Sequence, residues 1–199
     1  MGPQGSYADS MRLIDPIVLE NSHVRLEPLD GRHADDLTAA REGLEYAWYT
    51  SVPASVPEEI DHRLAEHAAG RMNPWAVVAG SRAVGMTTFC NIDQDNRHVE
   101  IGHTWLSRGV QRTAVNTAAK LLLLAHAFET CQAIAVELRT AWHNRQSRAA
   151  IERLGAKQDG VLRNHRLGPD GSLRDTVVYS ILPHEWAGVR LGLEASLQR

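Results

Sequence analysis

The spacing of apolar residues switches between two periods along this chain. From Ile134 to Leu138 every second residue is apolar, which is typical of a strand with one buried face. Residues 118–128 are almost wholly apolar apart from Lys120 and His126, as in a helix packed between a sheet and another layer. With Gly, Pro, Asp and Asn as boundary signals, the pattern predicts strands at 24–28, 75–79, 83–91, 98–106 and 134–140, helices at 30–43, 57–70, 116–128 and 144–155, and two last strands around a turn at 168–171.

This mixed order of strands and helices predicts an α/β fold with one central sheet. The G-x-G-x-x-G fingerprint of the doubly wound dinucleotide folds is absent from the sequence. A chain of 199 residues that is 43% hydrophobic can bury one sizeable core. We therefore expect a single domain over residues 17–199. Residues 1–16 lack the basic start and apolar stretch of a signal peptide, and we expect them to form a flexible leader.

Residues 99–124 read as a strand, a short loop and an abruptly starting helix. A loop of this kind brings backbone N–H groups to the positive end of a helix, where they favour a phosphate. We take Asn116 as the N-cap. An ordinary buried helix fits the same residues. The phosphate interpretation assigns cofactor contacts to the loop and first turn: Gln111, Arg112, Thr113, Ala114, Val115, Asn116 and Thr117.

Charge is unevenly distributed although the net charge is only −3. Between Arg108 and Arg174 there are eleven Lys and Arg against five Asp and Glu, a net of +6, which leaves −9 for the remainder. This positive part coincides with the proposed phosphate site. No basic run carries interleaved aromatic residues, so we expect no nucleic-acid partner. No stretch approaches the ~20 apolar residues of a membrane span, so we expect no membrane partner.

Two cysteines, Cys90 and Cys131, lie far apart without a C-x-x-C or His-rich pattern. This argues against a disulfide framework and against a zinc site. We expect both to be small buried residues, no metal to be bound, and the protein to be cytoplasmic.

Several segments together resemble one known family. They are HVRLEPLD (23–30), VEIGHTWL (99–106), NTAAKLLLLAHAFE (116–129), the N-x-x-S-x-x-A-x-x-x-L-G-A pattern of residues 144–156, and GVLRNHRLGPDGSLRDTVVYSIL (160–182). In this order they resemble the GNAT superfamily of N-acetyltransferases, in the RimJ/RimL-like branch of ribosomal-protein-alanine acetyltransferases. The resemblance implies a mixed, mostly antiparallel sheet with helices on both faces and a V-shaped splay between two parallel strands.

The resemblance also implies acetyl-CoA as cosubstrate. The cofactor strand would present the backbones of Trp105 and Leu106, and Asn144 and Ser147 would contact the pantetheine from the start of their helix. One departure concerns the family's pyrophosphate loop, Q/R-x-x-G-x-G/A. Here residues 111–116 contain neither glycine, and glycine allows the closest backbone approach to a ligand.

Catalysis by direct amine attack needs a base and a proton donor for the leaving thiolate. Glu100, on the strand beside the thioester, is our first choice for the base, although an ordinary strand glutamate facing solvent fits equally. Ser147 is the counterpart of the serine that RimL-like enzymes are thought to use as acid. A purely structural role, capping the helix together with Asn144, also fits.

The acceptor side is predicted from the same resemblance. His165 and Asp175 lie on the last hairpin, where the acceptor should bind, and they are weaker candidates for the base. Trp48 and Tyr49 lie in a segment that helps to cover the acceptor pocket in this family, although ordinary packing also explains them.

Two classes of function remain. The first is an acetyl-CoA-dependent N-acetyltransferase that acts on a primary amine, either a protein N-terminus or a small molecule. The second is a catalytically degenerate acyl-CoA-binding or scaffold protein of the same fold, an option that the glycine-free loop opens. We favour the enzyme, with an amine acceptor as partner and a homodimer as one possible assembly.

Overall fold

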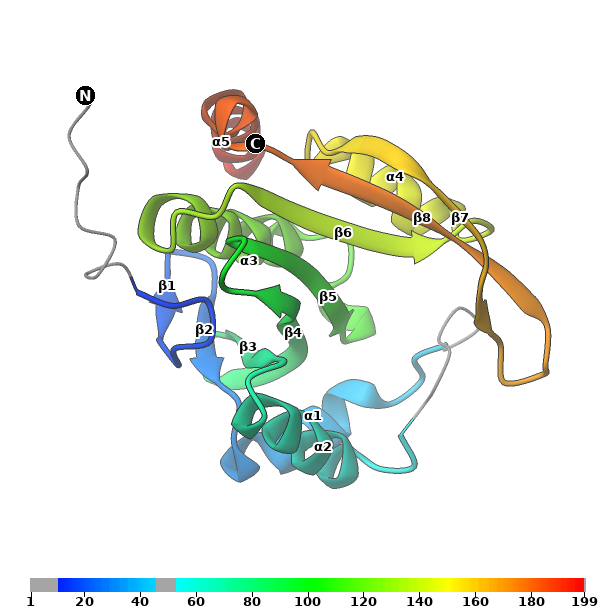
Figure 1. Cartoon of the computed structure of the whole chain (residues 1–199). Coiled ribbons are helices and arrows are strands. Elements are labelled where there is room, and N and C mark those ends of the chain that lie inside the picture. The colour runs from blue at the N-terminus through cyan, green and yellow to red at the C-terminus, as the bar shows by residue number, and fades with distance from the viewer. Residues whose placement is uncertain (1–10, 46–52, 199) are drawn as a thin grey trace.

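The structure, a computed structural model, describes residues 11–45 and 53–198. It is built around one eight-stranded sheet in the order β1-β2-β3-β4-β5-β6-β8-β7 (Figure 1). All neighbouring strands pair antiparallel except β5 and β6, which are parallel. The strands are β1 (Leu19–Glu20), β2 (Arg25–Pro28), β3 (Asn73–Ala79), β4 (Arg82–Asp93), β5 (His98–Leu106), β6 (Ala135–Ala141), β7 (Lys157–Leu167) and β8 (Leu173–Ile181).

Helices cover both faces of this sheet, because alternate strand residues are apolar on both sides. In β3, Trp75 and Val77 belong to the larger core, whereas Ala76 and Val78 belong to a second core on the opposite face. The larger core includes residues of α3 (Ala114–Ala125), α4 (Arg145–Arg153) and α5 (Pro183–Leu197), and the second includes α1 (Ala34–Arg41) and α2 (Val56–Ala68). This arrangement confirms the expected mixed α/β fold.

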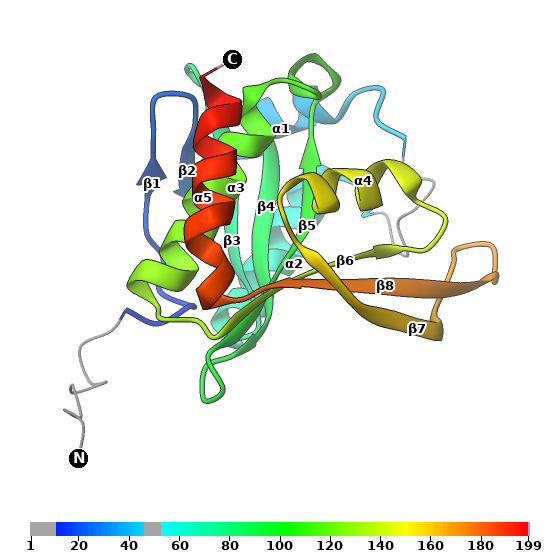
Figure 2. The same cartoon turned by 90° about the horizontal axis from the view of Figure 1, so that it is seen from above.

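The last helix and the first strand are the elements that the hydrophobic pattern missed. Helix α5 lies beside α3 (Figure 2), and its Trp186 ring packs on Phe128, with ring centroids 5.6 Å apart. The Trp186 indole also donates to Glu129 at 2.7 Å. Helix α5 has a weak apolar face, so its helical state depends on this tertiary contact more than on its own periodicity.

Residues 11–16 do not behave as the expected flexible leader. Leu13 is fully buried in the larger core, and its N–H donates to the Gln94 side chain at 2.9 Å. The Asn73 amide donates to the Leu13 and Asp15 carbonyls at 2.9 and 3.0 Å. The packed domain therefore begins before residue 17, because one apolar side chain and its paired backbone suffice to anchor the segment.

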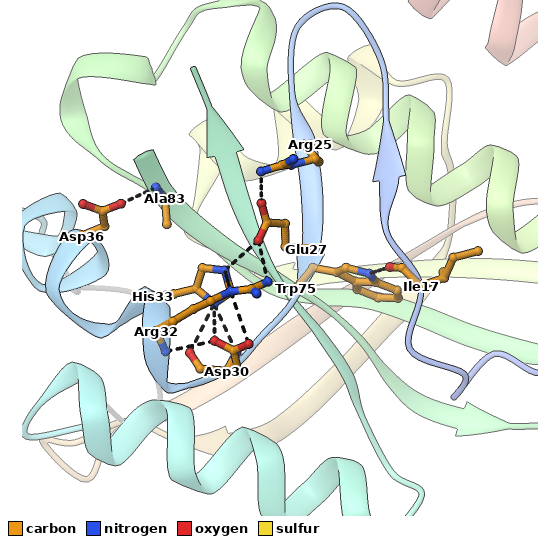
Figure 3. Close-up of polar contacts among 9 residues, drawn as sticks. All are labelled: Ile17, Arg25, Glu27, Asp30, Arg32, His33, Asp36, Trp75 and Ala83. Carbon is orange, nitrogen blue, oxygen red and sulfur yellow. Dashed lines mark hydrogen bonds and ion pairs between the residues drawn. The ribbon is translucent and has the colours of Figure 1, made fainter. Parts of the chain in front are cut away.

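A polar cluster links β2 to the turn that follows it (Figure 3). Asp30 caps the turn of residues 31–33 by accepting from the Arg32 N–H at 2.9 Å, as its sequence position predicts. The buried Glu27 carboxylate accepts from Arg32 at 2.7 Å, contacts the His33 ring at 3.2 Å and also pairs with Arg25. These contacts lower the pKa of Glu27, although burial opposes the shift. They compensate for removing the carboxylate from water.

Strands β5 and β6 pair over only three residues each, 98–100 with 135–137. Beyond this point the two strands diverge toward their C-terminal ends (Figure 1). The divergence is the V-shaped splay that the family resemblance implies. Among the described residues, no helix is long and apolar enough to cross a bilayer.

Candidate functional site

A cavity of about 640 Å³ opens where β5 and β6 separate. Its walls come from the ends of these strands, the first turns of α3 and α4, and the β7–β8 hairpin. The fold thus gathers residues that lie far apart in the sequence. Six residues singled out from the sequence line this cavity together: Glu100, Asn116, Asn144, Ser147, His165 and Asp175.

Glu100 lies on β5 at the point where the splay begins, and only 9% of the residue is exposed. Its carboxylate accepts from the Asn91 amide at 2.7 Å and lies 3.4 Å from the Arg139 guanidinium. Burial raises the pKa of Glu100, and the contacts with Asn91 and Arg139 oppose that shift. The residue is therefore not the solvent-facing strand glutamate that was the alternative, and a raised pKa suits a general base.

Gly102 leaves space for the Glu100 carboxylate. A Cβ at Gly102 would lie 2.8 Å from the Cys90 sulfur and 3.0 Å from Glu100 Oε1. Because both neighbours are held in the strand pair, a side chain at this position would displace the carboxylate. The pattern VEIGHTWL offers no hint of this constraint, since it arises from the fold of β4 against β5.

The strand pair β4–β5 contains a bulge immediately after Gly102. Met86 pairs with Trp105 and Thr88 with Gly102, so two residues of β5 oppose one of β4. His103, at the bulge, has a left-handed backbone with φ of +46°. A bulge interrupts the hydrogen bonds between the two strands and changes the direction of the backbone. Here it lies on the cavity wall, because both Gly102 and His103 line the cavity.

The N-terminus of α3 differs from the prediction in one respect. Thr113, not Asn116, is the N-cap: its hydroxyl accepts from the Val115 N–H at 3.4 Å. Asn116 is the third residue of the helix and lines the cavity. Hydroxyl and amide side chains are both good caps, so the sequence alone did not distinguish them.

The missing glycines do not distort this loop. Ala114 and Asn116, which occupy the glycine positions of the family pattern, lie in the first turn of α3 and are not among the residues with positive φ. Within this loop, the residue with a left-handed backbone is Arg112, with φ of +64°. First-turn N–H groups have no acceptor within their own helix, so those of Ala114 and Asn116 can meet an anion.

The remaining loop and strand residues lie around this helix start. The Gln111 amide folds back and donates to the Leu106 carbonyl at 2.9 Å, which fixes the loop to the end of β5. Trp105 turns its ring to the opposite face of the sheet, where its indole donates to Glu59 at 3.1 Å. As predicted, the Trp105 ring therefore does not face the splay. Thr117 follows in the first turn of α3.

Asn144 and Ser147 occupy the start of α4. Asn144 is the N-cap, and its side-chain oxygen accepts from the Ser147 N–H at 3.0 Å. The capping role predicted for Asn144 is thus confirmed. Ser147 also lines the cavity, and its role as acid stays a prediction.

His165 and Asp175 face the cavity from the β7–β8 hairpin. The His165 ring lies 3.0 Å from the Thr176 hydroxyl, and burial lowers the pKa of His165, with Arg166 adding to the shift. The Asp175 carboxylate accepts from the Asn164 N–H at 2.8 Å and from Arg163 at 2.6 Å. These hydrogen bonds lower the pKa of Asp175, the backbone bond most. Asp175 is therefore a poorer base than Glu100.

Trp48 and Tyr49 lie outside the described residues, so their predicted place beside the acceptor is untested. Lys120 and Arg166 are cavity residues that sequence reasoning did not select. Lys120 interrupts an apolar helix, and that interruption was the one signal available in the sequence.

Both cysteines are free and buried, as expected. Within residues 11–45 and 53–198, no group of three or more His, Cys, Asp or Glu side chains could hold a metal ion.

Comparison with known proteins assigns the family. Residues 23–157 match the family model for the acetyltransferase (GNAT) domain. YdaF of Bacillus subtilis (strain 168), whose name assigns it provisionally to the ribosomal N-acetyltransferases, is 38% identical over 104 residues, 52% of this chain and 56% of YdaF. The match thus spans about half the length of this curated relative.

Solved structures agree over most of the chain. A crystal structure from T. thermophilus, described provisionally as an acetyltransferase, is 35% identical, covers 92% of this chain and 98% of its own, and has a TM-score of 0.78. Mycobacterium smegmatis RimJ, solved with CoA-disulfide, shares the fold with a TM-score of 0.79 at 24% identity, covering 92% of this chain and 96% of its own. The chain belongs to the acetyltransferase (GNAT) domain family.

Proposed function

We propose that this protein is an acetyl-CoA-dependent N-acetyltransferase that acts on a primary amine. The observation that carries the proposal is the buried Glu100 carboxylate at the apex of the splay, in the same cavity as the starts of α3 and α4. Free thiols at Cys90 and Cys131 favour a reducing compartment, and we place the protein in the cytoplasm.

The residues present suit acetyl-CoA. The start of α3 offers N–H groups and a helix dipole to a diphosphate, and the adjacent Arg112 adds a positive charge. The ends of β5 and β6 leave backbone groups unpaired along the splay, which suits the amides of a pantetheine arm. The bound cosubstrate supplies the acetyl thioester, and all other steps belong to residues of the chain.

Three groups then share the chemistry. Glu100 takes a proton from the acceptor amine, directly or through water. Backbone N–H groups at the β5 bulge polarise the thioester carbonyl, since Gly102 and His103 of the bulge line the cavity together with Glu100. Ser147 donates a proton to the departing thiolate from the start of α4. Asn144 keeps Ser147 in place by capping the helix.

The acceptor approaches from the β7–β8 hairpin, where His165 and Asp175 line the cavity. Both a protein N-terminus and a small-molecule amine fit this proposal. The name of YdaF supports the first, because it points to a ribosomal acceptor for that relative. A degenerate protein that binds acyl-CoA without turnover is the competing function, but the preserved helix start at α3 and the buried base at Glu100 favour an enzyme.

The test combines binding and turnover. Acetyl-CoA at a hundred times its Kd should add about 2.7 kcal/mol of stability, seen as a raised melting temperature. Release of free CoA thiol should then be measured with a panel of N-terminal peptides and small amines. No stabilisation by millimolar acetyl-CoA would contradict the proposal, and stabilisation without turnover on any amine would favour the degenerate protein.

A further inference from the structure

The chain has only two lysines, and their surroundings are opposite. Lys157 is exposed at the start of β7, and its ammonium pairs with Glu185 at 2.5 Å. Lys120 lies in the second turn of α3 and only 6% of the residue is exposed. An ammonium is almost never buried without a charged partner, so the burial of Lys120 is unusual.

The Lys120 amine donates to the Thr104 hydroxyl at 2.9 Å, and that hydroxyl lies 2.8 Å from the hydroxyl of the fully buried Thr87. Within the described part of the chain, no carboxylate lies within ion-pairing distance of the amine. The neighbouring Cys90 does not supply a charge, because burial raises the pKa of its thiol far above the ordinary value. Burial lowers the pKa of Lys120 to about 7. The titratable or charged groups that line the same cavity are Glu100 on β5, Arg139 on β6, His103 at the bulge, His165 and Arg166 on β7, and Arg174 and Asp175 on β8.

Lys120 lines the cavity one helical turn farther along α3 than Asn116. Asn116 and Lys120 are four residues apart, so they share one face of the helix, and both line the cavity. At a rise of 1.5 Å per residue, Lys120 lies about 10 Å along the helix from its cap at Thr113. A diphosphate held at the helix start is therefore not the partner of this amine.

We propose that Lys120 is a catalytic residue whose ammonium faces the leaving sulfur and holds its negative charge. The inference rests on the proposed function. When the acceptor nitrogen bonds to the carbonyl carbon, the C–S bond breaks and its electron pair stays on sulfur. The fixed ammonium of Lys120 stabilises that thiolate until Ser147 protonates it. Ser147 then regains a proton from solvent. Lys120 thus stabilises the negative charge on sulfur, and Ser147 supplies the proton.

The two-lysine composition permits a direct test without turnover. Protein labelled with ¹³C at the lysine side chains gives two Cε signals, one for each lysine, and Lys157 serves as the internal control. Each signal is titrated against pH for the free protein, with CoA, and with desulfo-CoA, which has the same phosphates but no sulfur. We expect the Lys120 pKa to be higher with CoA than with desulfo-CoA by about one unit or more, because the thiolate of bound CoA places an opposite charge within contact range, and such a charge produces shifts of this size.

A second measurement follows the sulfur. The ultraviolet absorbance of the thiolate reports the pKa of bound CoA, and Lys120→Met should raise that pKa by about one unit or more, with Lys157→Met as the matched control. Lys120→Met should also lower the ratio of the affinity for CoA to the affinity for desulfo-CoA by about tenfold. The inference is overturned if CoA and desulfo-CoA give the same Lys120 pKa, or if a folded Lys120→Met protein keeps the wild-type thiol pKa. If neither CoA ligand binds, the proposed function fails as well, so the two failures are distinguishable.

Discussion

Arg63 and Glu59 form a buried ion pair, one turn apart on α2, with 2.5 Å between Nη2 and Oε1. Only 4% of Arg63 and 7% of Glu59 are exposed. The same guanidinium donates to the His103 carbonyl at 3.1 Å and to the Thr88 hydroxyl. Glu59 also accepts from the Trp105 indole. The pair therefore holds the β5 bulge in place, from the face of the sheet that lies opposite α3.

Glu59→Gln should destabilise the protein by about 3–5 kcal/mol, because it leaves the Arg63 guanidinium buried without a counter-charge. Urea unfolding measures the loss. The control is Glu66→Gln, which removes an exposed partner of Arg71 on the same helix and should change stability little. Equal effects in the two variants would show that the buried pair contributes no more than a surface pair.

Glu100→Gln should lower kcat by about 10²-fold or more, with little change in acetyl-CoA affinity, because it removes the base and keeps the shape. In the wild-type protein, activity should fall with decreasing pH as Glu100 becomes protonated. Since burial raises this pKa, the midpoint should lie above the ordinary glutamate value of 4.5. The variant should lose this acidic limb. A pH–rate profile with the limb intact would assign the base to another residue.

Ser147→Ala should reduce kcat less than Glu100→Gln does, because water can still protonate the thiol. Asn144→Ala is the companion variant: it removes the cap of α4 and should cost about 1 kcal/mol of stability. Kinetics and thermal melts separate the two roles. If Ser147→Ala keeps the wild-type kcat, the serine serves only the helix.

Gly102→Ala should impair catalysis without removing any reacting group. Its Cβ would approach both Glu100 Oε1 and the Cys90 sulfur too closely, so the carboxylate must move. We expect kcat to fall while acetyl-CoA binding, measured by thermal shift, is retained. Gly109→Ala is the control, since nothing lies within 4 Å of a Cβ there. Wild-type kcat in Gly102→Ala would mean that the position of the carboxylate is not critical.

Protein stability should depend on pH through Lys120. Its folded-state pKa, about 7, lies below the unfolded value of 10.5, so the unfolded chain binds more protons between these values. The Lys120 contribution should therefore rise as pH increases from about 7 toward 10 and fall as pH returns to 7. Lys120→Met should flatten the free energy of unfolding over this range relative to wild type. Parallel curves for the two proteins would indicate that the lysine titrates normally.

The sequence by itself determined most of the secondary elements and the family, but not β1 or α5. Apolar periodicity and turn residues specify strands and helices locally, so β3, β4, β5 and the α4 cap were predicted close to their observed places. The motif order between residues 23 and 182 was enough to identify the GNAT fold and its splay. Short-range propensity and chain order carry this information without any knowledge of packing.

Only the tertiary structure decided which residues meet. The burial of Glu100, the space that Gly102 leaves and the absence of a carboxylate within ion-pairing distance of Lys120 among the described residues depend on β4, β5, β6 and α3 meeting at one cavity. Likewise, α5 is held by packing of Trp186, and Leu13 is buried in the core, where the Gln94 and Asn73 side chains hydrogen-bond to its backbone. Burial and charge partnership are set by contacts between segments far apart in the chain, and a linear pattern does not encode those contacts locally.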